Sequence, residues 1–251
     1  GNIYNRELYF SKAAKYFQQG ALLAQQLGDE PAFRNIQWLT ANALLEDGKF
    51  NEAHTAFLKL LETHEAAGRY EEQVRTLEKL AETCLDLSNF KKAVDYYLKI
   101  KQLAERKKDT TTAATALNNL GFTSNRQQDF QAAVDYFTQA EVIYAAKPSA
   151  KTNYVYTNLA IAYNNLGESR LSLQNLQKAD NGLDDKSYVQ HLIASIYLKN
   201  KDIYNALKYN ELAIGSAKKS KNMQVECDAF EAASQIYTQL FEYDKALDFY
   251  K

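Results

Sequence analysis

Residues that interrupt helices or cross-link small folds are scarce in this sequence. Its 251 residues include two prolines, nine glycines and two cysteines. Because proline and glycine disfavour a helix interior more than any other residues, their scarcity suits a nearly all-helical chain. The two cysteines, Cys84 and Cys227, are too few for a disulfide framework, and we expect Cys84 to be a small residue of the core.

An excess of charge of either sign is also missing. Thirty lysines and arginines stand against thirty-one aspartates and glutamates, which gives a formal net charge of −1. Broad binding to nucleic acid or to an anionic membrane needs a basic surface, so we expect no nucleic-acid partner. No apolar run is long enough to span a bilayer and no secretory signal opens the chain. We therefore expect no membrane insertion and favour the cytoplasm, while a signal removed from a longer parent stays open.

Patterns that carry catalysis or metal binding are absent as well. The sequence has no glycine-rich phosphate loop, no His-Glu-x-x-His pair and no cluster of cysteines and histidines. The three histidines, His54, His64 and His191, are not spaced as a pair of metal ligands on one helix face. We therefore predict a protein that is not an enzyme, with no catalytic residue, no metal site and no cofactor.

A helical pattern around Ala133 organises the rest of the chain. Phe130, Ala133, Phe137 and Ala140 are spaced three, four and three positions apart, which places them on one face of an α-helix. The preceding segment, which starts at Leu117, reads as a second amphipathic helix. A helix pair this short cannot bury its apolar face alone, so it needs similar pairs on both sides.

Similar pairs do recur, and each is centred on a small residue. The centres, here called the anchors, are Ala13, Ala53, Ala93, Ala133, Ser172, Ala206 and Ala246. Three positions before them stand Phe10, Phe50, Phe90, Phe130, Ser169, Ile203 and Tyr243, and four positions after them stand Phe17, Phe57, Tyr97, Phe137, Leu176, Asn210 and Tyr250. The anchors recur at a nearly constant step, and only the step from Ser172 to Ala206 is clearly shorter. We predict that the anchor alanines from Ala53 onward are buried where helices cross.

The central copy resembles the tetratricopeptide repeat. Leu117-x2-Leu120-Gly121 and Ala133-x3-Phe137 follow the pattern of that family, with Ser124 in place of its tyrosine. Later copies supply the tyrosine as Tyr163, Tyr197 and Tyr237. The resemblance covers essentially the whole chain and implies an all-α, right-handed superhelical solenoid of antiparallel helix pairs. Since the common step of the family is about 34 residues, the longer step here, of about 40, predicts roughly one and a half extra helical turns in most repeats.

The predicted domain organisation is a single solenoid over residues 1–251. It consists of a half repeat at 5–29, with a helix over 5–26, then repeats at 33–68, 72–109, 113–147, 153–183, 187–222 and, truncated, 225–251. Thr110 to Thr112 are candidate N-caps for the helix that follows them, and Pro148 breaks the chain before the fifth pair. The fifth copy ends early at Asn181-Gly182, and its shorter step predicts a local change of curvature.

The ends of the predicted array look unfinished, because solenoids normally close with a polar capping element. We therefore expect the sequence to be a fragment of a longer protein. Phe241, Leu247 and Phe249 lie on the final helix with nothing after them to cover their apolar surface. This predicts self-association through residues 230–250.

The resemblance also implies where a partner binds. In tetratricopeptide arrays the first helix of each pair lines the concave groove, which holds a protein or peptide ligand. Transferred to this sequence, the main candidates are Asn118, Asn119, Phe122, Asn125, Arg126, Tyr154, Asn158, Asn164, Asn165 and His191. Further lining positions near the N-terminus are Asn35, Trp38 and Arg75. The carboxylate clamp of the chaperone-binding members is not reproduced, since Asn42 has no upstream lysine and Lys79 stands where an asparagine is required.

Two asparagine pairs suggest how such a groove would hold a peptide. Asn119 and Asn158 occupy equivalent positions in adjacent repeats, and Asn125 and Asn164 have the same separation along the chain. An asparagine amide both donates and accepts hydrogen bonds, so a ladder of them can pair with a peptide backbone. The alternative is that these residues are ordinary solvated side chains on polar helix faces.

Two functions remain open at this point. The first is a protein- or peptide-binding scaffold module inside a larger regulatory protein. The second is a peptide-sensing regulatory domain of a bacterial signalling protein, of the sensor kinase or phosphatase regulator type. RNA reading by helical repeats would need a basic groove, which the charge balance does not supply.

Overall fold

The protein is all-α, and its helices come in pairs. The computed structural model describes residues 13, 16–17, 19–146 and 150–249, and these contain no β-strand. Residues 19–26 are helical. The first helices of the pairs are α2 (Glu30–Glu46), α4 (Tyr70–Asp86), α6 (Thr110–Arg126), α8 (Ala150–Asn165), α10 (Ser187–Lys199) and α12 (Met223–Gln239). The second helices are α3 (Phe50–Ala66), α5 (Phe90–Lys107), α7 (Phe130–Ala146), α9 (Ser169–Gly182), α11 (Ile203–Ser220) and α13 (Tyr243–Asp248).

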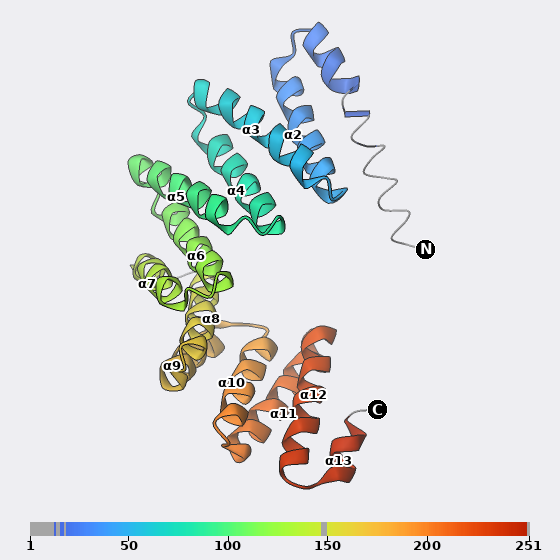
Figure 1. Ribbon diagram of the computed structural model, residues 1–251, viewed down its shortest axis with the longest axis vertical. Helices are drawn as coiled ribbons and strands as arrows, with labels where there is room; N and C mark the ends of the chain where they lie inside the picture. The colour runs from blue at the N-terminus through green and yellow to red at the C-terminus, as the bar shows by residue number, and fades with distance from the viewer. Residues whose placement is uncertain (1–12, 14–15, 18, 147–149, 250–251) are drawn as a thin grey trace. The chain divides into compact units, whose positions relative to one another are not determined.

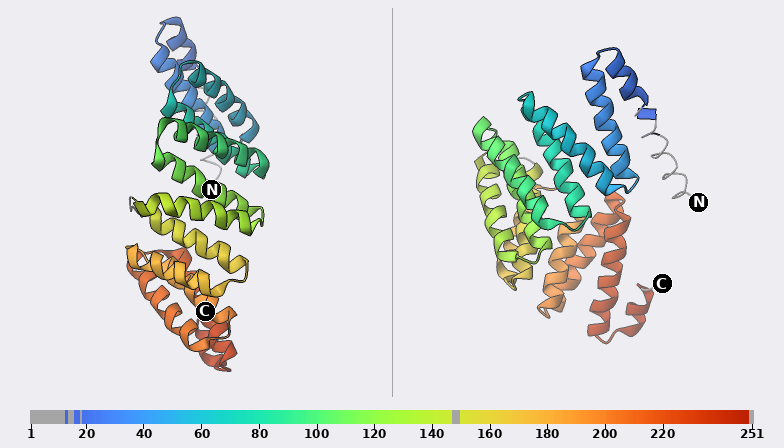
Figure 2. Two further views of the ribbon diagram at one scale, coloured as in Figure 1. Left: turned by 90° about the vertical axis from the view of Figure 1, so that its left-hand side faces the viewer. Right: turned by 45° about the horizontal axis from the view of Figure 1, so that its top comes forward.

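The chain divides into two compact units, residues 1–123 and 124–251. In the first unit, α2 packs against α3, α3 against α4, and α4 against α5. In the second unit, the same holds from α7 to α13, and α10 also contacts α12. Figures 1 and 2 show the helices of both units as consecutive hairpins. The start of the predicted helix 5–26, with Phe10, as well as Pro148 and Tyr250, lies outside the described residues.

A repeated turn sets the regular spacing of the helices. From α2 to α8 the helices begin at equal intervals, at Glu30, Phe50, Tyr70, Phe90, Thr110, Phe130 and Ala150. In the described turns before these helices, one residue has a positive φ; these residues are Gly28, Gly48, Gly68, Ser88, Lys108 and Gln128. Lys108 is typical: its N–H donates to the Glu105 carbonyl and the next N–H, of Asp109, donates to the Ala104 carbonyl at 2.9 Å. This is a Schellman motif, which satisfies the last carbonyls of one helix before the next begins.

The residue after each positive φ serves as the N-cap of the next helix. The Asp29 carboxylate accepts a bond from Ala32 N–H at 3.0 Å, and the Asp109 carboxylate accepts one from Thr112 N–H at 3.1 Å. Asp129 caps α7 in the same way. The cap of α6 is therefore Asp109, and the prediction that Thr110 to Thr112 supply it is wrong, because the Schellman turn already fixes which residue precedes the helix.

The anchor alanines from Ala53 onward are buried, as predicted. Ala53, Ala93, Ala133 and Ala206 are fully buried, and Ala246 is 6% exposed. Buried small residues let neighbouring helix backbones approach closely, and the large side chains four positions later fill the space beside them. Those side chains are Phe57, Tyr97, Phe137 and Leu176, which are at most 4% exposed. Cys84 is buried with its pKa raised by that burial, in agreement with its predicted place in the core.

Two copies place polar residues in this core. Ser172, the anchor of the fifth copy, is fully buried and donates from Oγ to the Ala160 carbonyl at 2.7 Å. Asn210 occupies a position that other copies give to a large apolar side chain, and it donates from Nδ2 to the Ala229 carbonyl at 2.9 Å. Both bonds join a second helix to a first helix, so these residues replace apolar packing with one directed contact.

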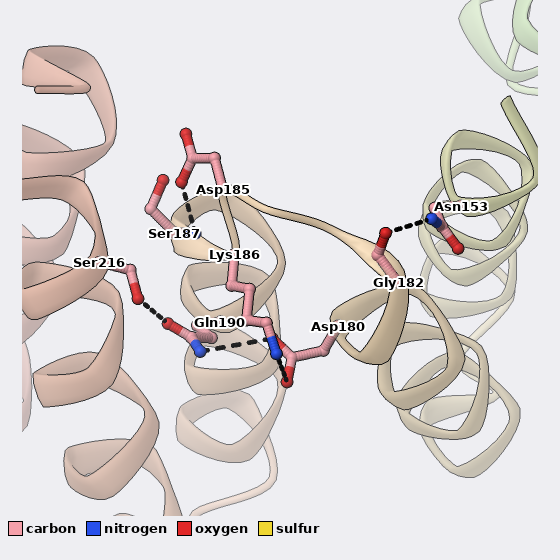
Figure 3. A network of polar contacts seen from close by, with 8 residues as sticks. All are labelled: Asn153, Asp180, Gly182, Asp185, Lys186, Ser187, Gln190 and Ser216. Atoms are coloured by element: carbon pink, nitrogen blue, oxygen red, sulfur yellow. Dashed lines mark hydrogen bonds and ion pairs between the residues drawn. The ribbon is translucent and has the colours of Figure 1, made fainter. Parts of the chain in front are cut away.

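The pair α8–α9 has a short second helix, and a polar network holds the chain where it leaves that helix. Helix α9 has 14 residues, whereas α3 and α7 have 17. Asn153 donates from Nδ2 to the Gly182 carbonyl at 2.7 Å, which ties the end of α9 to α8 (Figure 3). Beyond the turn, Gln190 on α10 donates to Asp180 at 3.3 Å and accepts from Ser216 on α11 at 2.8 Å. Three hydrogen bonds among α8, α9, α10 and α11 thus hold the helix ends on both sides of the irregular segment 183–186.

Two further findings concern only the described residues. None of the described helices is both long enough and apolar enough to cross a bilayer. Within the same residues, no three acidic, cysteine or histidine side chains gather as a group that would hold a metal ion.

Candidate binding surfaces

The candidates from the sequence all lie on first helices, but their exposure differs. Phe122 on α6 is 45% exposed and Tyr154 on α8 is 61% exposed, which is high for aromatic side chains. Arg126 and Asn165 are also exposed. The remaining candidates are half-buried: Asn118, Asn119, Asn125, Asn158, Asn164 and His191. Exposed aromatic residues flanked by half-buried amides suit a surface that contacts a polar chain.

The candidates are split between the two units. Asn118, Asn119 and Phe122 belong to the first unit, and the others, from Asn125 onward, belong to the second. Asn119 and Asn158, the first rung of the expected ladder, therefore fall in different units.

In the second asparagine pair, Asn125 is hydrogen-bonded to the residue next to Asn164. Asn165 donates from Nδ2 to Asn125 Oδ1 at 3.1 Å. Asn164, the residue expected opposite Asn125, instead has its Oδ1 buried without a hydrogen-bond partner among the described residues. An amide oxygen without a partner is an acceptor that a ligand N–H can use, provided that the ligand reaches it.

A groove of about 670 Å³ lies between α10 and α12 in the second unit. His191, Ser195 and Leu198 line it from α10, and Asp228, Glu231 and Gln235 line it from α12. It forms because the first helices of consecutive repeats lie side by side, with α11 behind them. Its lining mixes carboxylates with the ammonium groups of Lys199 and Lys201, so neither sign of charge dominates.

His191 is a half-buried polar residue of this groove. Burial lowers its pKa, and the carboxylate of Asp228 opposes that effect. Its Nδ1 is buried and has no hydrogen-bond partner among the described residues. The charge of Asp228 also adds to the burial that raises the pKa of the Tyr188 phenol. Asp228 already accepts a hydrogen bond from Gln224 Nε2 at 2.9 Å, so the buried nitrogen of His191 is the acceptor or donor that a ligand could use here.

The sequence identified His191 but missed the α12 side of this groove. The candidates taken from the first helices stopped at the sixth pair, so Asp228, Glu231 and Gln235 were not among them. A signal for them exists in the sequence, because α12 is the first helix of the copy centred on Ala246 and carries these residues at helical spacing.

The comparison with protein families agrees with this geometry. Residues 72–146 match the family model described as "Tetratricopeptide repeat". These residues carry tetratricopeptide repeats. The family resemblance and the all-α solenoid of helix pairs predicted from the sequence are therefore confirmed. Tetratricopeptide repeats are typically scaffolds for protein interaction without catalytic groups of their own, and solenoids bind through their extended surfaces.

Solved structures support the same fold, all at low sequence identity. BtubC (BKLC) from P. vanneervenii has a TM-score of 0.72 at 16% identity, over 84% of this chain and 92% of its own. A signal transduction ATPase with numerous domains and a tetratricopeptide repeat sensor, from Pyrococcus horikoshii, has a TM-score of 0.70 at 18% identity, over 98% of this chain and 40% of its own. A Rap protein in complex with competence and sporulation factor has a TM-score of 0.60 at 17% identity, over 98% and 71%. No curated protein matches the sequence.

Proposed function

We propose that the chain is the protein-binding part of a larger regulatory protein and binds an extended peptide segment along its first helices. The observation that carries the proposal is the groove between α10 and α12. There a buried His191 nitrogen without a partner among the described residues lies among carboxylates and amides that can pair with a peptide backbone. The exposed Tyr154 on α8 and Tyr188 on α10 supply aromatic contacts of the kind that dominate peptide interfaces.

A displayed library of random peptides, selected on the immobilised chain, tests the proposal. We expect the selected peptides to bind about tenfold more weakly to Tyr154→Ala and to His191→Ala, as is typical when an interface loses a central contact. Tyr204→Ala is the matched control, because Tyr204 is 80% exposed but lies on the second helix α11. Peptides that lose affinity only for Tyr204→Ala would place binding on the second helices and overturn the proposal.

A second candidate function is a peptide-sensing domain of a signalling protein. It is favoured by the two structural neighbours named above that align with 98% of this chain, one with a repeat sensor and one solved with a bound factor. In a sensing domain, the bound peptide would fill the groove and also change the curvature of the solenoid. Small-angle scattering with and without a selected peptide separates the two functions, since a scaffold keeps its radius of gyration and a sensor changes it.

We also propose self-association through the C-terminal helices. Phe241, Tyr243 and Leu247 are 77%, 61% and 56% exposed. Phe230 and Tyr237, by contrast, are engaged within the chain through ring contacts with Phe249. Sedimentation velocity should reveal a dimer that Phe241→Ser weakens, and a monomer at all concentrations would contradict the proposal.

A further inference from the structure

A second cavity, of about 250 Å³, lies in the first unit at the start of α2 and α4. Arg34 and Trp38 line it from α2, His64 from α3, Arg69 from the turn before α4, and Glu72 and Arg75 from α4. Three arginines and one glutamate give this lining a charge of +3 − 1 = +2. Because the whole chain has a net charge of −1, the cavity is a local concentration of positive charge rather than part of a basic surface.

The three guanidinium groups have little compensation from carboxylates. The side chain of Arg34 is only 19% exposed, yet its ion pair with Glu30 is long, at 3.5 Å, and the Glu30 side chain is 70% exposed. In the part of the chain that the structure describes, neither Arg69 nor Arg75 lies within 4.0 Å of a carboxylate oxygen. Arg69 is half-buried as well, whereas Arg75 is exposed. Cations without close counter-ions favour the binding of an anion, which restores the balance of charge.

Trp38 holds one of these arginines in a defined orientation. The Arg75 guanidinium lies over the indole ring with its carbon 4.3 Å from the ring centroid. Trp38 itself packs edge-on against the buried Phe57, with ring centroids 5.4 Å apart, so the indole is a supported wall. Stacking uses the flat face of a guanidinium and leaves the N–H groups around its edge available, which is the geometry that recognises phosphate oxygens.

His64 adds enclosure to the cavity without adding charge. It is 5% exposed, and burial lowers its pKa; Glu72 raises that pKa, while Arg69 and Arg34 lower it further. Its Nδ1 lies 3.1 Å from Thr76 Oγ1, and that hydroxyl donates to the Glu72 carbonyl at 2.6 Å. Since the threonine proton is already used, Thr76 accepts from a protonated Nδ1 of His64. The imidazole is thus fixed in place, and the positive charge of the cavity comes from the arginines.

We propose that this cavity is a binding site for a phosphate monoester, carried by a phosphorylated side chain of the partner. A phosphate monoester has a charge of about −1.5 to −2 near neutral pH and three acceptor oxygens, which match the lining charge and the guanidinium edges. A carboxylate, with a single charge, leaves the lining positive. The source of the phosphate rests on the proposed peptide-binding function, but the site itself does not, and it is tested without a peptide.

Trp38 makes the test direct, because it is the only tryptophan among the 251 residues. Inorganic phosphate is titrated at constant ionic strength, with chloride replacing it in the reference, and tryptophan emission is recorded. We expect a saturable change of emission, and an affinity at least about tenfold weaker in Arg69→Gln, which removes one charged partner without touching the indole stack. Arg106→Gln, an exposed arginine at the end of α5, is the matched control and should leave the affinity unchanged.

A second set of binding experiments, with peptides, identifies the source of the phosphate. One short peptide is compared with phosphoserine, serine or glutamate at its central position, and calorimetry confirms each affinity. The proposal expects binding of the phosphoserine form only. Equal binding of the glutamate form would make this a carboxylate site, and binding of inorganic phosphate without the phosphopeptide would make it a site for a small free anion; either result overturns the proposal.

Different results would contradict the phosphate site and the proposed peptide-binding function. An emission change that chloride reproduces, or an unchanged affinity in folded Arg69→Gln, overturns the phosphate site even when library peptides still bind at α10 and α12. The opposite outcome is also possible to recognise. If the phosphopeptide gives a saturable response but the selected library peptides bind His191→Ala as tightly as wild type, the phosphate site stands and the α10–α12 groove is overturned. Circular dichroism of each variant establishes that it is folded.

Discussion

Tyr70 donates a hydrogen bond from its hydroxyl to Asp109 Oδ2 at 2.9 Å, so that the first residue of α4 contacts the N-cap of α6. The same carboxylate accepts from the Thr112 hydroxyl at 2.6 Å and from the Thr112 N–H at 3.1 Å. One carboxylate thus caps a helix and joins the beginnings of two consecutive first helices. The contact links neighbouring repeats of the first unit.

Asp109→Ala should therefore destabilise the protein more than Asp129→Ala. Both substitutions remove an N-cap, which costs about 1 kcal/mol, but only the first also removes the bond to Tyr70. The measurement is the midpoint of urea denaturation for each variant. Equal losses, or a larger loss for Asp129→Ala, would show that the contact with Tyr70 contributes nothing to stability.

The same site predicts a dependence of stability on pH. The bonds from Thr112, and then that from Tyr70, hold the pKa of Asp109 below its ordinary value of 3.8, against the opposite effect of burial. A carboxyl group with a lowered pKa in the folded state stabilises that state above its unfolded pKa, and the contribution disappears as the pH falls through the folded value. Below about pH 4, wild type and Asp109→Asn should therefore converge in stability. A difference that persists well below this range would contradict the assignment.

Two glycines should respond to alanine in opposite directions. Gly48 has φ = +75° in the turn between α2 and α3, with open space around the position of a Cβ. Its replacement should cost about 1–2 kcal/mol from the left-handed backbone alone. Gly215 lies within α11, also with open space, and its replacement should stabilise by about 0.5–1 kcal/mol through helix propensity. Thermal denaturation of both variants tests these expectations. A lower stability of Gly215→Ala than of wild type would contradict the open space around this position.

Gly182 is constrained in a different way, by the side-chain amide of Asn153 on α8. A Cβ at this position would lie 2.5 Å from Asn153 Nδ2, the atom that donates to the Gly182 carbonyl. Gly182→Ala should displace Asn153 and cost at least the lost hydrogen bond, about 0.5–1.5 kcal/mol. In an Asn153→Ala background the same change should cost much less. Additive effects in this double-mutant cycle would mean that the two residues act independently.

The anchor of the central repeat provides a test of packing. Ala133 is fully buried on α7, whereas Ala145 on the same helix is exposed. Ala133→Leu should overpack the helix crossing and cost about 1–3 kcal/mol. Ala145→Leu, with the same added atoms, should change the stability by less than about 0.5 kcal/mol. Comparable effects at both positions would contradict the assigned register of the repeat.

The sequence by itself determined the helix pairs and their buried faces. The regular step with a small residue at the centre of each copy predicted Ala93 and Ala133 as buried anchors, and glycine marked the turns at Gly28 and Gly68. Periodicity carries this information because a helix repeats every ~3.6 residues, so a buried stripe is visible in the order of residues alone. At Gln128 the same left-handed conformation occurs without glycine, so glycine alone did not mark every such residue.

The tertiary structure decided which polar groups meet. Asn125 is hydrogen-bonded to Asn165 and not to Asn164. Asn164 and Asn165 are adjacent on α8, so their side chains leave the helix in different directions. Arg34, Arg69 and Arg75 enclose one cavity although they come from two helices and a turn. A hydrogen bond or a charge cluster depends on positions that are accurate to less than the axial rise of a single helical residue, and on the reach of long side chains. Repeat spacing fixes the backbone only to within a helical turn, so the contacts between side chains follow from how the helices pack.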